Sequence, residues 1–97
     1  MKYQVWLTES AKEDIQYFRP SEQRMIVAGT IAHLSANAAV DSRNNKPLRP
    51  NLIAPRELRL DAFRVFYTIV DNRLVKVVAV GRKVQNKLLI RGEEVKL

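Results

Sequence analysis

The sequence predicts a single small α+β domain, in which a helical hairpin covers one face of an antiparallel sheet. Three observations predict this fold. A short β-branched and aromatic segment opens the chain, two segments with helical apolar spacing follow, and three strand-like runs occupy the second half. A chain of 97 residues, 46% of them apolar, can form about one small core, so residues 1–97 are expected to be one domain. The expected order is β-α-α-β-β-β, with one further short strand.

The first half is expected to form a strand and two helices. Residues 3–7 are predicted to be a strand that ends at a helix start, where Thr8 or Ser10 can cap the helix and Ser10 with Glu13 fits a capping box. Helical spacing in the first helix relates Ala11, Ile15 and Phe18. Pro20 ends that helix and suits the first turn of the next. The second helix is expected over residues 21–38, with an apolar stripe of Val27, Ile31, Leu34 and Ala38.

The second half is expected to be a loop followed by a meander. Residues 41–55 have three prolines, three asparagines and no periodicity, which is typical of a loop. Strands are predicted at 57–60, 63–70 and 74–80, joined by turns short enough for hairpins, and a last short strand near 88–90 before a turn at Arg91-Gly92. We expect the helices to cover one sheet face and to leave the other free for a ligand.

Composition narrows the chemistry that the chain can support. There is no cysteine, and His33 is the only histidine, which excludes disulfides, thiol catalysis and nearly every zinc site. No cofactor or metal is expected. No run reaches the ~20 apolar residues of a membrane-spanning helix and no secretory signal is recognisable, so we expect a cytoplasmic protein.

The charge is uneven along the chain. Lys and Arg number 17 against 10 Asp and Glu, a formal net charge of +7. Residues 1–42 carry four basic and five acidic side chains, whereas residues 43–97 carry 13 basic and five acidic ones. The excess therefore lies entirely in the second half, which is expected to attract polyanions such as nucleic acid, and equally an acidic protein segment.

The hairpin expected around Asp61-Ala62 sets the direction of its basic side chains. A two-residue turn pairs Arg59 with Arg64 on one face, and directly opposed like charges suggest a bound anion. Alternation places Glu57 on the same face, and Lys83 as well if the last long strand continues to it. A solvated basic face without a ligand is the alternative interpretation.

These residues suit phosphodiester chemistry without a metal. Arg59, Arg64 and Lys83 would hold the phosphate, because cations stabilise the charge that develops on it. The 2′-hydroxyl of RNA supplies its own nucleophile, and Glu57 is the candidate base, which the neighbouring arginines would make a weak one. His33 is expected to be passive, and the aromatic residues to be packing residues.

Four segments together resemble the toxins of the RelE/ParE superfamily of bacterial toxin–antitoxin systems: Asn45-Lys46-Pro47-Leu48, Glu57-Leu58-Arg59-Leu60, Phe63-Arg64-Val65-Phe66-Tyr67 and Val78-Ala79-Val80-Gly81-Arg82-Lys83. The resemblance implies a cytosolic toxin inhibited by a cognate acidic antitoxin. RelE-type members cut mRNA in the ribosomal A site by 2′-hydroxyl attack, and Arg59, Arg64 and Lys83 match the basic residues of such sites. Candidate RNA contacts around them are Lys46, Arg49, Arg56, Arg82 and Lys87.

One position departs from the RelE pattern. Where many RelE-type toxins carry a tyrosine near the C-terminus, this chain has Leu88 or Leu89. That removes a stacking surface for an RNA base and a proton relay. Two alternatives therefore stay open: a ParE-like inhibitor of DNA gyrase, and a catalytically weakened member that binds nucleic acid without cutting it.

Overall fold

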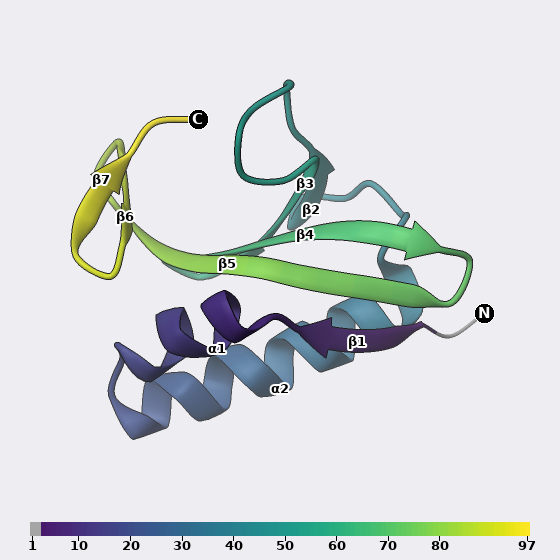
Figure 1. The fold of residues 1–97 in the computed structure, drawn as a ribbon, viewed down its shortest axis with the longest axis horizontal. Coiled ribbons are helices and arrows are strands. Elements are labelled where there is room, and N and C mark those ends of the chain that lie inside the picture. The colour runs from purple at the N-terminus through teal and green to yellow at the C-terminus, as the bar shows by residue number, and fades with distance from the viewer. Residues whose placement is uncertain (1–2) are drawn as a thin grey trace.

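The computed structural model describes residues 3–97 and contains two helices and seven strands. The order confirms the predicted strand, helical hairpin and meander, and adds strands at both sides of the meander (Figure 1). The elements are β1 (Gln4–Leu7), α1 (Glu9–Gln16), α2 (Pro20–Asn37), β2 (Asn45–Pro47), β3 (Arg56–Leu60), β4 (Phe63–Asp71), β5 (Leu74–Val84), β6 (Lys87–Ile90) and β7 (Glu93–Val95).

The strands form one sheet in the order β2-β3-β4-β5-β6-β7. All neighbours on this path are antiparallel, and β1 pairs in parallel with the first part of β5. Strand β5 extends four residues beyond the predicted Val80, to Val84, where it pairs with β6. Strand β7 was not predicted, and β2 corrects the expectation that residues 41–55 are all loop.

Both helices begin as the sequence chemistry requires. Thr8 caps α1, because its Oγ1 accepts a hydrogen bond from the Ala11 amide at 3.1 Å. The predicted capping box of Ser10 and Glu13 is wrong, because both residues lie inside α1. Pro20 opens α2, where the Arg19 amide donates to Glu22 Oε1 at 3.2 Å. Neither helix within residues 3–97 is long and apolar enough to cross a membrane.

The main core lies between the helices and the sheet, as Figure 1 shows. Helix α2 contributes Ile26, Thr30 and Leu34, whereas the predicted stripe placed Ile31 inside. Ile31 is 52% exposed, because the buried face is turned about one residue from the one that we predicted. Ile31 instead borders a cavity of about 70 Å³ between β1 and the two helices.

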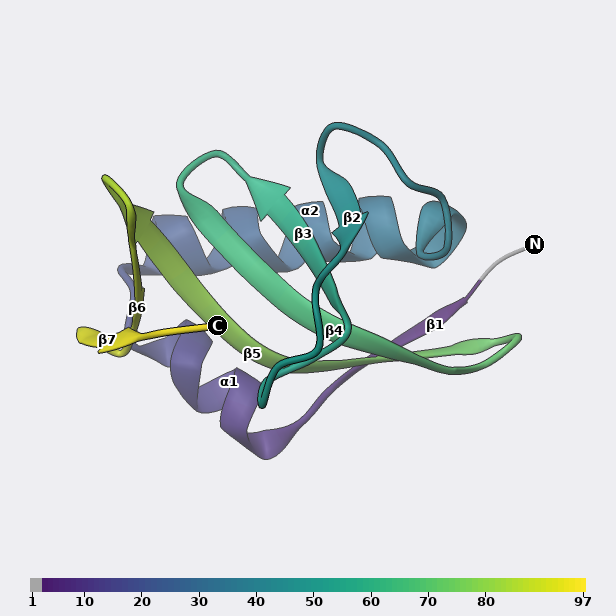
Figure 2. The ribbon, with the colours of Figure 1, turned by 90° about the horizontal axis from the view of Figure 1, so that it is seen from above.

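The opposite face, here called the open face, is only partly free. A second apolar cluster is centred on Phe66 and Ala79, and the β2–β3 loop and the β6–β7 hairpin pack over it. Figure 2 shows that loop passing over β4 and β5. The expectation of a bare face is therefore wrong in the middle of the sheet. The uncovered part lies toward the β3–β4 turn.

Asp14 is a buried carboxylate that joins α1 to the sheet. Its side chain is 1% exposed, and its Oδ2 accepts from the Val80 amide at 3.0 Å. Arg91, in the β6–β7 turn, places Nε 2.9 Å from Asp14 Oδ1 and Nη1 3.3 Å from Glu13. Burial raises the pKa of Asp14, and this effect outweighs the opposing effects of the Val80 amide and Arg91.

The raised pKa of Asp14 predicts a pH dependence of stability. A folded-state pKa above the unfolded value means that the folded chain binds the proton more tightly, so stability falls as pH rises from the usual carboxyl range through the folded pKa. Asp14→Asn removes this titration. We therefore expect the unfolding free energy of the wild type minus that of Asp14→Asn to decrease with rising pH, measured by urea unfolding at matched pH values. A difference that is constant or increases with pH contradicts the assignment.

Candidate functional site

The β3–β4 hairpin has the predicted register. Leu60 pairs with Phe63, Arg59 with Arg64 and Leu58 with Val65. The connecting residue Asp61 has φ 53°, a left-handed conformation that aspartate tolerates better than most residues. The tight turn therefore brings Arg59 and Arg64 opposite each other on the open face.

Glu57 is the buried partner of these two arginines. Its side chain is 7% exposed, and Oε2 lies 3.0 Å from Arg59 Nε, which donates a hydrogen bond to it. Its strand neighbours in register are Lys46 on one side and Phe66 on the other. Glu57 thus supplies a negative charge beneath a surface that is otherwise cationic.

Arg64 is held over the hairpin turn. Its Nη1 donates to the carbonyl oxygens of Asp61 at 2.7 Å and Phe63 at 2.9 Å. Burial lowers the pKa of Arg64, the charge of Glu57 opposes this, and the charge of Arg59 lowers it further. Both hydrogen bonds use Nη1, which leaves the Nε and Nη2 donors of the planar fork for an anion.

Lys83 and Lys46 complete the group on the open face. Lys83 is exposed, and its amide donates to the Ala62 carbonyl at 2.7 Å, which places it beside the β3–β4 turn. Lys46, on β2, lies next to Glu57. We call Lys46, Arg59, Arg64 and Lys83, arranged around Glu57, the basic cluster. It occupies the uncovered part of the open face.

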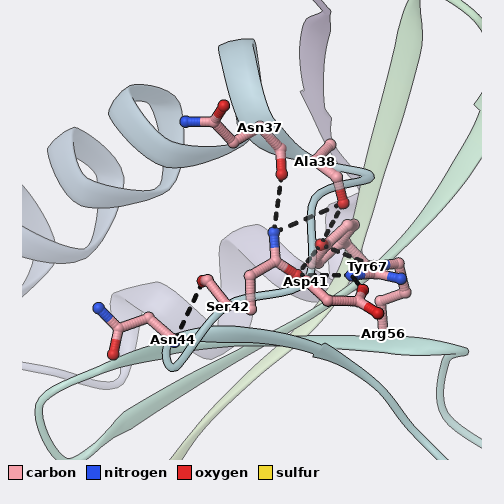
Figure 3. A network of polar contacts seen from close by, with 8 residues as sticks. Asn37, Ala38, Asp41, Ser42, Asn44, Arg56 and Tyr67 are labelled. Atoms are coloured by element: carbon pink, nitrogen blue, oxygen red, sulfur yellow. Dashed lines mark hydrogen bonds and ion pairs between the residues drawn. The ribbon is translucent and has the colours of Figure 1, made fainter.

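Arg56 lies apart from the basic cluster, on the helix side of the sheet. Strand alternation turns it away from Glu57, and its side chain is 15% exposed. Figure 3 shows the network that holds it: Nε donates to the Tyr67 hydroxyl at 3.0 Å, and Nη2 donates to Asp41 at 2.7 Å and Asn45 at 3.2 Å. These bonds give Arg56 a structural task.

The same network ties the end of α2 to the sheet. The Tyr67 hydroxyl lies 2.7 Å from the Ala38 carbonyl and also contacts Asn45 Oδ1, and Asn45 Nδ2 donates to the Asn37 carbonyl at 3.0 Å. Burial raises the pKa of Tyr67, against the lowering effect of Arg56. Local sequence patterns did not predict this network, because Asn45, Arg56 and Tyr67 lie on three different strands.

Arg82 is the second candidate that faces the helices. Its guanidinium carbon lies 4.8 Å from the centroid of Phe63 and 5.5 Å from that of Phe18, and its Nη2 pairs with Glu22 at 2.5 Å. Arg82 is adjacent to Lys83 in β5, and successive side chains of a strand point to opposite faces of the sheet. Arg82 therefore fastens α2 to β5.

The remaining candidates lie at the margins. Arg49 is exposed on the β2–β3 loop, above the open face, and Lys87 is exposed at the start of β6. The structure thus brings together five of the nine candidates, namely Lys46, Glu57, Arg59, Arg64 and Lys83. Among residues 3–97 no group of three or more His, Asp or Glu side chains is arranged to hold a metal ion.

The fold resembles solved toxin–antitoxin structures. A chain of the crystal structure of the toxin–antitoxin complex RelBE2 from Mycobacterium tuberculosis is 26% identical, with 86% of this chain and 93% of that chain covered and a TM-score of 0.74. The YoeB dimer from Staphylococcus aureus is 20% identical, covers 88% and 99%, and has a TM-score of 0.61. The fold is RelE-like, and the likeness to the chain from the RelBE2 complex supports a place among the RelE-like toxins. No protein-family model matches the sequence, and a search of curated proteins gives no match.

Within this RelE-like chain, the two leucines that replace the expected tyrosine point in opposite directions. Leu88 is in register with Lys83 on the open face, where it is buried in the second apolar cluster. Leu89 pairs with Arg82 and lines a cavity of about 280 Å³ on the other side, which Tyr17 also lines. Neither leucine offers a hydroxyl or an aromatic ring to the basic cluster.

Proposed function

We propose that this protein is the toxin of a toxin–antitoxin pair and that it cuts mRNA on the ribosome. The observation that carries the proposal is the basic cluster: two opposed arginines and two lysines gather on the uncovered part of one sheet face. Glu57 offsets one of these four positive charges, so the basic cluster keeps a net positive charge that an anionic ligand would balance. The resemblance to the chain from the RelBE2 complex supports the toxin role, and the cognate antitoxin would be an acidic protein that covers this positive half.

The proposed reaction is metal-independent transesterification. The 2′-oxygen of one nucleotide bonds to the adjacent phosphorus while the bond from phosphorus to the 5′-oxygen breaks. The 2′-hydroxyl loses its proton to a base, the 5′-oxygen gains one, and the products are a 2′,3′-cyclic phosphate and a 5′-hydroxyl. Arg64 and Arg59 stabilise the charge on the equatorial phosphate oxygens, and Lys83 assists as the leaving oxygen gains charge.

Glu57 fits the role of an anchor better than that of a base. A base must reach the proton that it removes, and Glu57 is buried with Oε2 on Arg59 Nε. Glu57 therefore holds Arg59 in place and offsets the repulsion between Arg59 and Arg64, and another group of the complex takes the proton.

Two substitutions of Glu57 separate these roles. A general base contributes about 10²–10⁴-fold to the rate, so Glu57→Gln would remove that factor if Glu57 were the base. As an anchor, Glu57→Gln keeps an acceptor for Arg59 Nε, and we expect a rate loss below about tenfold. Glu57→Ala removes the acceptor for Arg59 Nε, so we expect this variant to cleave mRNA more slowly than Glu57→Gln. Cleavage rates on ribosome-bound mRNA measure the difference.

A non-cleaving protein is the second candidate function. It is favoured by Leu88 and Leu89, one of which stands where many RelE-type toxins carry a tyrosine, and by the hydrogen bond between Arg59 and Glu57. Such a protein would inhibit DNA gyrase, as ParE-type toxins do, or bind nucleic acid without toxicity. Gyrase inhibition would induce DNA-damage signalling and leave mRNA intact.

Induction of the protein in cells, with and without its neighbouring gene, distinguishes the candidates. The proposal expects growth arrest that the neighbouring gene relieves, with new mRNA 5′ ends and no DNA-damage response. Growth arrest with a DNA-damage response and unchanged 5′ ends would replace it with the gyrase candidate. Unimpaired growth, combined with nucleic-acid affinity that falls steeply with salt, would leave only a binding module.

A further inference from the structure

The β2–β3 loop, residues 48–55, is closed on itself by one side chain. Asn51 Nδ2 donates to the carbonyl oxygens of Arg49 at 2.8 Å and Ala54 at 2.9 Å. Its Oδ1 accepts from the amides of Ile53 at 2.7 Å and Ala54 at 3.0 Å. The Leu48 amide donates to the Pro55 carbonyl at 2.8 Å across the base of the loop. These bonds hold the loop in one conformation.

The underside of the loop is also anchored. Leu48, Ile53 and Ala54 pack into the second apolar cluster with Phe66 and Ala79, so the loop stands on the open face (Figures 1 and 2). Phe66 lies on the same face as Arg64, two residues along β4. The loop and the basic cluster are therefore parts of one continuous surface.

Leu52 projects from this rigid loop into solvent. Its relative exposure is 105%, so no part of the protein covers the side chain, while Ile53 and Ala54 beside it face inward. Exposed leucines on mobile loops are ordinary, but a loop held by its own hydrogen bonds presents this leucine in a fixed position. Such preorganisation lowers the entropy cost of binding.

The charges around Leu52 point to a nucleic acid. Residues 42–56 contain four basic side chains and no acidic one. Arg49, three residues before Leu52, is exposed, and Lys46 is half-buried at the base of the loop. An apolar side chain flanked by cations is the arrangement that nucleic-acid-binding proteins use to separate stacked bases while they hold the phosphates.

We propose that residues 48–55 form a wedge that separates two stacked bases of the bound RNA, with Leu52 between the bases and Arg49 on a flanking phosphate. The proposal rests on the proposed function, because it places RNA on the open face. It assigns the β2–β3 loop a task distinct from that of the basic cluster: the wedge opens the strand, and the basic cluster acts on the phosphate.

Fluorescence of 2-aminopurine tests the wedge directly, because this base brightens when it is unstacked. The probe is a short oligoadenylate with 2′-O-methyl groups, which stacks well and cannot be cut, carrying one 2-aminopurine at each position in turn. We expect the wild type to raise the fluorescence at one step of the strand. Leu52→Ser should abolish that rise, and should lower affinity by about threefold to tenfold. The slope of affinity against salt should not change, because the phosphate contacts remain.

Val70→Ser is the matched control, because Val70 is 53% exposed and lies at the far end of β4. It should leave the fluorescence rise intact, and melting temperatures should show that both variants are folded.

A fluorescence rise that persists in Leu52→Ser overturns the wedge. So does a Leu52→Ser protein that binds RNA with wild-type affinity but fails to bind the product of the neighbouring gene. If Arg64→Ala lowers cleavage while Leu52→Ser changes neither signal, the proposed function stands and only the wedge fails. A wild type that binds no oligoadenylate removes the wedge, while cleavage of ribosome-bound mRNA still decides the proposed function.

Discussion

Arg64→Ala is expected to lower mRNA cleavage by about 10²–10³-fold, the usual loss when one preorganised donor to a developing oxyanion is removed. Arg64 is the member of the basic cluster whose position is most firmly set, because Nη1 is bonded to two carbonyl oxygens at the β3–β4 turn. The remaining donors of its fork are therefore preorganised for a phosphate. Initial rates on ribosome-bound mRNA measure the loss.

Arg73→Ala provides a control of equal charge. Arg73 is exposed in the β4–β5 turn, at the opposite end of β4 from Arg64. It should retain wild-type cleavage, while any general effect of net charge on RNA affinity should be similar in the two variants. Arg64→Lys should recover part of the activity, because lysine restores charge without the planar fork. Equal rates for Arg64→Ala and Arg73→Ala would show that the basic cluster is not the site.

Tyr67→Phe is expected to destabilise the fold by about 2 kcal/mol, which corresponds to a melting temperature lower by about 10 °C for a domain of this size. The hydroxyl accepts from Arg56 Nε and lies 2.7 Å from the Ala38 carbonyl. Its removal leaves the buried Nε of Arg56 without this partner and loosens the link between the end of α2 and β3. Thermal and urea unfolding both measure the change.

Tyr17→Phe is the matched control for that loss, because Tyr17 is 58% exposed at the end of α1. Its melting temperature should stay close to the wild-type value. Cleavage by folded Tyr67→Phe should also stay near wild type at temperatures well below its melting point, since the network lies on the helix side of the sheet. A Tyr67→Phe protein as stable as Tyr17→Phe would mean that the network contributes little.

The hairpin register was predictable because loop length and side-chain alternation determine it. The turn at Asp61-Ala62 was enough to place Arg59 opposite Arg64. Side-chain alternation also predicts the faces of two further arginines. Arg56 is next to Glu57 and Arg82 is next to Lys83, so each arginine points to the face opposite its neighbour. Applied to every basic residue, alternation would have assigned both arginines to the helix side.

Other features depend on contacts that local patterns do not encode. Strand β2 spans only three residues, which include an asparagine and a proline. Asn45 is buried in β2, where its Oδ1 contacts Arg56 Nη2 and the Tyr67 hydroxyl. The cover over the open face arises because loop residues such as Ile53 reach Phe66. The prolines and asparagines of residues 41–55 therefore predicted neither strand β2 nor the packing of the β2–β3 loop on the sheet.

Purified protein added to ribosomes that carry a defined mRNA tests the proposed cleavage. We expect a cut in the A-site codon, with a 2′,3′-cyclic phosphate on the upstream fragment and a 5′-hydroxyl on the downstream one, and a cut slower by about 10²–10³-fold with Arg64→Ala. Intact mRNA in the presence of folded wild-type protein, or cleavage that Arg64→Ala leaves unchanged, would contradict it.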